Sequence, residues 1–117
     1  MKIENYEWKM RTVMRNDTDL DVTAVDEADA AHPDAKVVDL FLVAKDGKIT
    51  VTDATNNKTY EGTYSVSGKN PKGTDYEITI DGKEGYATVA MPEYADGTEE
   101  PTLPINLGTH LMYFYAE

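Results

Sequence analysis

The feature that most constrains this fold is an alternation of apolar and polar residues with a period of two, in short runs separated by turn residues. Successive side chains of a β-strand point to opposite faces, so this pattern is typical of strands with one buried face. The runs are residues 6–14, 37–44, 49–54, 59–67, 76–81, 85–91 and 111–116, and a further strand is expected in 102–107 or 19–25. We therefore expect an all-β protein.

Turn residues of defined type join several of these runs. Asp46 and Gly47 separate two runs, and Asp81 with Gly82 is the strongest hairpin signal in the chain. A meander of hairpins can close into a barrel, which removes the exposed edge strands that invite aggregation. We predict one all-β domain over residues 1–117, an antiparallel meander of about eight strands closing into a small lipocalin-like barrel, with a β-sandwich as the alternative.

Three segments interrupt the pattern. Residues 15–36 combine strand-like alternation with a possible helix start at Thr23, and we expect a loop with one helical turn across a barrel mouth. Residues 68–74 contain so many turn residues that no strand is expected there. The acidic stretch 93–100 is bounded by prolines and is expected to be a loop.

Charge and composition exclude several classes of partner. The chain has 22 Asp and Glu against 11 Lys and Arg, a net charge of −11, which repels nucleic acid and anionic membrane surfaces. It has no cysteine, so it can form neither disulfides nor thiolate metal sites. No apolar run is long enough to suggest membrane insertion, and the first residues do not resemble a signal peptide, so an exported form would have lost its leader.

The sequence shows no catalytic or metal-binding motif. Asp17, Asp19 and Asp21 are spaced as in a calcium loop, but the glycine and glutamate that such a loop needs are absent. His32 and His110 have no second ligand at a spacing that would aim two side chains at one metal. We expect a protein that is not an enzyme and that carries no metal and no cofactor.

The aromatic residues are the main candidates for ligand binding, because their faces stack on sugars and line apolar pockets. Most of them fall on the apolar faces of the expected strands and are predicted to be core residues: Trp8, Tyr60, Tyr64, Tyr76 and Tyr86. Tyr94, in the acidic loop, is the best candidate for an exposed platform. The candidate ligand-binding residues are Trp8, Tyr86, Tyr94 and Tyr113.

Trp8 is predicted to be a structural anchor. Alternation along residues 6–14 places it on the inward face together with Met10 and Met14. If the barrel interior were to hold a small apolar ligand, the same three side chains would contact it.

Four segments resemble a lipocalin-like barrel domain found at the C-terminus of some secreted family 43 glycoside hydrolases, which act on arabinan and xylan. They are residues 62–68, 76–82, 85–91 and 112–116. The chain departs from the pattern at Tyr115, where a tryptophan is expected, and in a longer insertion at 99–107. The resemblance implies a non-catalytic extracellular module that packs on, or lies beside, a carbohydrate-active domain.

We therefore expect an accessory or carbohydrate-binding module of a secreted bacterial glycan-degrading enzyme, extracellular or at the cell surface. Its partner would be a polysaccharide or a neighbouring catalytic domain, and we expect a monomer. Two alternatives remain open: a lipocalin-like carrier of a small apolar ligand, and a cell-surface interaction or spacer domain.

Overall fold

The structure, a computed structural model, describes residues 2–15, 22–24, 36–70, 73–92, 95–108 and 110–117. A short 3-10 helix, η1 (Ile3–Asn5), precedes the first strand. The strands are β1 (Trp8–Arg15), β2 (Val22–Ala24), β3 (Lys36–Val38), β4 (Leu40–Lys45), β5 (Lys48–Asp53), β6 (Lys58–Asn70), β7 (Gly73–Ile80), β8 (Lys83–Ala90), β9 (Thr102–Asn106) and β10 (His110–Ala116).

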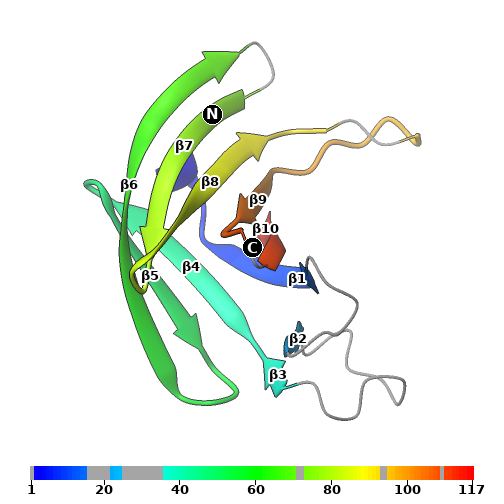
Figure 1. Ribbon diagram of the computed structural model, residues 1–117. Helices are drawn as coiled ribbons and strands as arrows, with labels where there is room; N and C mark the ends of the chain where they lie inside the picture. Colours follow the sequence, from blue (N-terminus) through cyan, green and yellow to red (C-terminus); the bar gives the residue numbers. More distant parts are fainter. Residues whose placement is uncertain (1, 16–21, 25–35, 71–72, 93–94, 109) are drawn as a thin grey trace.

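Eight strands form one closed antiparallel barrel in the order β1-β10-β9-β8-β7-β6-β5-β4 (Figure 1). From β4 to β10, strands that follow one another in the chain are also neighbours in the sheet, and β1 closes the circle between β10 and β4. This arrangement is an up-and-down barrel. The predicted fold class is confirmed, and the β-sandwich alternative is wrong.

Two tight turns follow the predicted hairpin signals. Asp46 and Gly47 have φ of 52° and 81°, and Asp81 and Gly82 have φ of 51° and 78°. Positive φ at both central residues defines the type I′ turn, whose twist matches that of the flanking strands. Both hairpins are therefore confirmed.

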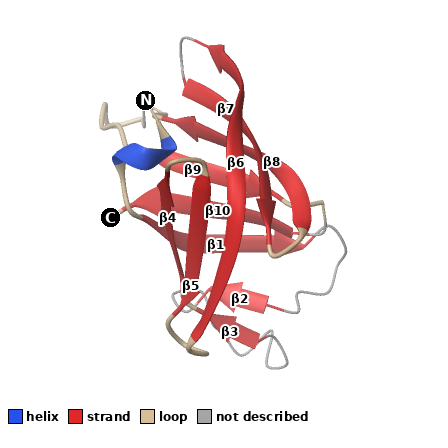
Figure 2. Cartoon of the chain, turned by 90° about the vertical axis from the view of Figure 1, so that its left-hand side faces the viewer, coloured by secondary structure: helices blue, strands red, loops and turns tan. Residues whose placement is uncertain are grey.

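The strands β2 and β3 form a separate parallel pair, with Val22 opposite Lys36 and Ala24 opposite Val38 (Figures 1 and 2). Within 15–36 the described residues 22–24 are thus a strand. Thr23, the possible helix start, lies in this strand, and residues 25–31, which would continue the helical turn, lie outside the described part of the chain.

The long hairpin between β6 and β7 corrects one prediction. Residues 68–74 were expected to be free of strand, yet β6 continues to Asn70 and β7 starts at Gly73. The register shifts between Val66 and Gly68, so a bulge accommodates an extra residue while the pairing continues. Cross-strand hydrogen bonds extend the ladder although the local residues favour turns.

A second bulge changes the inward face of β1. The pairing of β1 with β10 shifts between Met10 and Thr12, so the alternation changes phase. Met10 is buried before the shift, and Val13, opposite Met112, is buried after it. A strict alternation had placed Met14 inside; the side chain of Met14 lies outside the described part of the structure.

One end of the barrel is closed by η1. Ile3 is fully buried; its carbonyl accepts a hydrogen bond from Nε1 of Trp8 at 2.9 Å, and its N–H donates to the hydroxyl of Tyr76 at 3.1 Å. Nearby, the Tyr64 hydroxyl donates to Oε1 of Glu4 at 2.7 Å, and burial together with this bond raises the pKa of Tyr64 to about 12. We call this end the plugged end.

Candidate functional site

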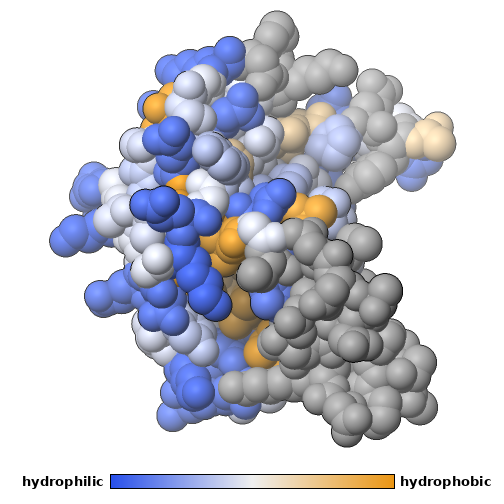
Figure 3. All heavy atoms as spheres, viewed as in Figure 1, coloured by the Kyte–Doolittle hydropathy of each residue, from blue (hydrophilic) through white to orange (hydrophobic). Residues whose placement is uncertain are grey.

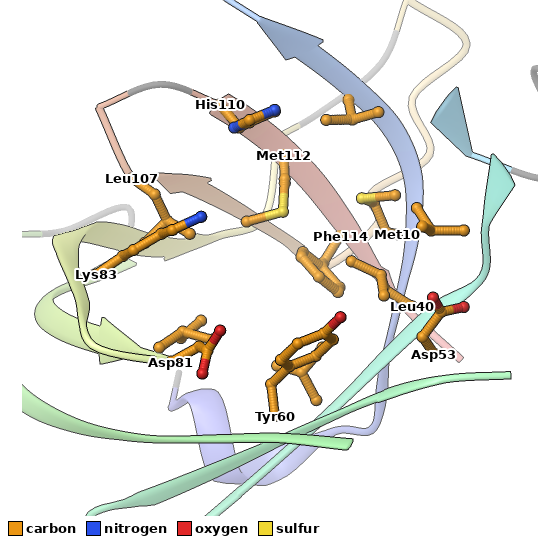
Figure 4. A pocket seen from close by; sticks show the side chains of 14 residues that line it. Met10, Leu40, Asp53, Tyr60, Asp81, Lys83, Leu107, His110, Met112 and Phe114 are labelled. Atoms are coloured by element: carbon orange, nitrogen blue, oxygen red, sulfur yellow. The ribbon is translucent and has the colours of Figure 1, made fainter. Parts of the chain in front are cut away.

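The opposite end, which we call the pocket end, contains a pocket of about 250 Å³. It lies where β5 and β7 finish and where β6, β8 and β10 begin. Buried apolar side chains, among them Met10 and Phe114, form its floor, whereas Asp81 and Lys83 at its rim are exposed. Figure 4 shows these side chains around a common space. The pocket thus extends from the surface into the core.

The space-filling view also shows apolar side chains next to polar ones. Hydrophobic side chains are visible near the centre of the face in Figure 3, with hydrophilic side chains to their left. A mainly apolar hollow with a polar margin is the usual form of a small-molecule site.

Strand register places polar side chains on the inner face at the rim of the pocket. On β5, Asp53 follows the buried Val51 by two residues, and Tyr60 of β6 lies directly opposite Val51. On β8, Lys83 lies opposite the buried Ile80. Each of these residues therefore occupies an inward position at the end of its strand.

His110 completes this arrangement. It begins β10, two residues before the buried Met112, and so also has an inward position at the rim. Figure 4 shows its ring beside Met112, on the same side of the pocket as Lys83 and Leu107.

Asp53 is 1% exposed, and its carboxylate is held by protein donors. Oδ1 accepts from the N–H groups of Asp39 at 3.1 Å, Thr55 at 3.1 Å and Asn56 at 3.3 Å, and Oδ2 accepts from Nδ2 of Asn56 at 2.6 Å. Burial raises the pKa of Asp53, but these hydrogen bonds outweigh it and hold the pKa below its usual 3.8. The carboxylate is therefore ionised, with three donors on Oδ1 and one on Oδ2.

The tyrosines divide between the core and the surface. Tyr76 is buried, and Tyr60 and Tyr64 are half-buried, as predicted for residues on apolar faces. Tyr86 was expected in the core but is 66% exposed, because the inward positions of β8 are those of Ala87 and Val89. The prediction for Tyr86 was wrong by one step of the alternation.

The predicted ligand-binding residues do not form one site. Trp8 is fully buried at the plugged end and does not line the pocket. Tyr86 and the half-buried Tyr113 lie on the outer face of the barrel, on β8 and β10, with β9 between them. Tyr94 lies outside the described residues.

Tyr86 belongs to a polar strip on the outer wall. Cross-strand pairing aligns Ser65, Glu77, Tyr86 and Asn106 in one row across β6, β7, β8 and β9. A shallow hollow of about 540 Å³ lies over this part of the wall. Tyr86 is the aromatic side chain of the hollow that is most exposed, and it is flanked by hydroxyl and carboxylate groups.

Sequence reasoning missed the rim residues Tyr60, Lys83, His110 and Asp53 as a group. The sequence contained a signal for them, because each of these residues lies at an inward position in the alternation of its strand. Their convergence depends on the closure of the barrel, which brings four strand ends together.

Comparison with protein-family models, curated proteins and solved structures finds no match to this chain. Among the described residues, no group of three or more His, Cys, Asp or Glu side chains is placed to hold a metal ion. The helical part of the described structure offers no segment long and apolar enough to cross a membrane.

Proposed function

We propose that this chain is a binding protein that holds a compact, mainly apolar ligand in the pocket at its pocket end. The observation that carries the proposal is a pocket of about 250 Å³ above Met10 and Phe114, which the side chains of the described residues leave unfilled. Eight-strand barrels can be filled by their own side chains or can hold one small ligand. An unfilled pocket favours the second use.

The size of the pocket limits the ligand. An apolar cavity of roughly 150 Å³ is enough to bind benzene, so a pocket of about 250 Å³ suits a ligand of about ten non-hydrogen atoms. Because the floor is apolar and the rim polar, the apolar part of the ligand would lie against Met10 and Phe114 and its polar group would lie near the rim.

A titration with 1-octanol, followed by methyl resonances in NMR, tests this proposal. Binding should shift the methyl signals of Ile80 and Met112, which line the pocket. Leu107→Trp should abolish the shifts, because the larger ring at the half-buried rim position fills the space. Tyr86→Ala, on the outer wall, serves as the control and should bind like the wild type. Unchanged pocket methyls at saturating octanol would refute the proposal.

A second candidate function is that of a non-catalytic accessory module that binds polysaccharide, outside a bacterial cell or at its surface, beside a catalytic domain. The exposed Tyr86 supports it, since it lies in a row with Ser65, Glu77 and Asn106. An exposed aromatic ring beside hydrogen-bonding groups can stack on a sugar ring and orient its hydroxyls.

Affinity electrophoresis in gels that contain xylan, arabinan, mannan or glucan tests this candidate. Retention in one of the gels should be lost in Tyr86→Ala and kept in Leu107→Trp, the reverse of the pattern expected for the pocket. Equal mobility of the wild type in all gels would remove the carbohydrate-binding role.

A further inference from the structure

Of the four polar residues at the rim of the pocket, Asp53 is already engaged. Asp53 is 1% exposed and receives four hydrogen bonds from the surrounding protein, three on Oδ1 and one on Oδ2. It therefore contributes to the shape of the rim and leaves little capacity for a ligand. The remaining inward polar groups are those of Tyr60 and Lys83, because His110 already interacts with another residue.

Lys83 is the lysine that lines the pocket in the described part of the chain. It lies at an inward position opposite the buried Ile80, as the first residue of β8 directly after the Asp81-Gly82 turn. Within the described part of the chain its ammonium forms no hydrogen bond and no ion pair. Figure 4 shows its side chain running beside Leu107 with the nitrogen toward the interior of the pocket. The methylene groups of a lysine can pack on an apolar surface while its ammonium group stays in contact with water.

The polar groups that line the pocket with Lys83 are of two kinds: Tyr60 and His110 carry hydrogen-bond donors, whereas Asp53 and Asp81 are carboxylates. Tyr60 is half-buried and its hydroxyl points into the pocket, and His110 presents its imidazole at the rim (Figure 4). An ammonium and a phenol hydroxyl suit an acceptor with negative charge. Asp81 is the opposing charge at the rim; like Lys83 it is exposed and lines the pocket, so water screens both charges.

Resting on the proposed binding function, we propose that the pocket selects a carboxylic acid: its carboxylate pairs with Lys83 and accepts from Tyr60 at the rim, and its compact apolar body lies on Met10 and Phe114. The net charge of −11 disfavours an anion at long range. At physiological salt the Debye length is about 8 Å, so the groups in direct contact outweigh distant charges.

Three probes of equal chain length separate the charge preference from apolar binding: octanoate, 1-octanol and octylamine. Calorimetry at pH 7.5 and 150 mM salt should show octanoate binding about tenfold more tightly than 1-octanol, in line with a charge-assisted hydrogen bond. Octylamine should bind most weakly. The NMR shifts of the methyl groups of Ile80 and Met112 would locate all three probes in the pocket.

Lys83→Met keeps the apolar stem and removes the charge. It should reduce the affinity for octanoate to that for 1-octanol and leave the affinity for 1-octanol unchanged. Lys48→Met, at an exposed position on β5 away from the pocket, is the matched control and should keep the preference. The melting temperature of each variant shows that it is folded.

The possible failures are distinguishable. If 1-octanol binds in the pocket but octanoate binds no more tightly, or if Lys83→Met keeps the preference, the carboxylate inference is wrong and the binding function stands. Tighter binding of octylamine than of octanoate would also overturn the inference. If none of the three probes binds to the wild type, both the inference and the proposed binding function fail.

Discussion

Trp8 shows how a single side chain can tie several elements together. It is fully buried, its Nε1 donates to the carbonyl of Ile3, and its ring makes an edge contact with Tyr6 at a centroid distance of 5.4 Å. Its backbone lies opposite Leu42 of β4 and Ala116 of β10. The same residue thus belongs to the core, to the plug and to the closure of the barrel.

Replacing Trp8 by alanine should cost about 3–5 kcal/mol of the free energy of unfolding, the usual range for removing a large buried aromatic side chain. Because a typical domain is stable by only about 5–15 kcal/mol, Trp8→Ala should be largely unfolded or should melt far below the wild type. Thermal melts followed by circular dichroism measure the difference. Tyr86→Ala should melt like the wild type, since its side chain is 66% exposed. Red-shifted Trp8 emission in the wild type, with an unchanged melt for Trp8→Ala, would contradict the core assignment.

Asp53 predicts a dependence of stability on pH. Its pKa is lowered in the folded state, so its ionised form favours folding at every pH above its usual value of 3.8. As the pH falls below 3.8 and through the folded-state pKa, this contribution is lost, because the unfolded chain takes up the proton first.

Asp53→Asn should be less stable than the wild type by about 1–3 kcal/mol at pH 7, since the buried N–H donors lose a charged acceptor. The difference should shrink as the pH is lowered below 3.8. Urea unfolding at pH 7, 5 and 3 provides the measurement. A difference that is constant across this range would show that the charge of Asp53 does not contribute to folding.

At the scale of the strands, glycines at inward positions determine how closely neighbouring strands approach. A Cβ at Gly85 of β8 would overlap the carbonyl oxygen of Asn106, and one at Gly62 of β6 would overlap the carbonyl oxygen of Thr79. Both contacts are with backbone, which cannot move aside as a flexible side chain can. These glycines allow the sheet to bend into a narrow barrel.

Gly85→Ala should therefore destabilise the protein by about 1–3 kcal/mol, the usual cost of forcing extra atoms into a packed region. Gly68→Ala is a matched control in β6, because the nearest atom to its added Cβ would be Oδ2 of Asp75 at an ordinary 3.6 Å. The control should change stability by less than about 0.5 kcal/mol. Chemical unfolding of both variants measures the difference, and equal midpoints would show that the β8 to β9 contact tolerates a methyl group.

At the scale of the whole molecule, local patterns predict the strands and their connections, whereas the pocket depends on what several strands leave unfilled. The hairpin at Asp81 and Gly82 is encoded in two adjacent residues, so it could be predicted. The bulge after Met10 depends on pairing with β10. The outward position of Tyr86 depends on which of the two alternating sets of β8 side chains packs into the core. The volume above Phe114 results from side chains of many strands and has no local signature.

The termini and the pocket lie at opposite ends of the barrel. At the plugged end the N–H of Glu117 donates to the carbonyl of Glu7 at 2.9 Å, so the chain's last residue lies beside the entry to β1 (Figure 2). Any polypeptide fused to either terminus would depart from that end, while the pocket lies at the other. A dye, a surface anchor or a second protein could therefore be attached at the termini without lying over the pocket.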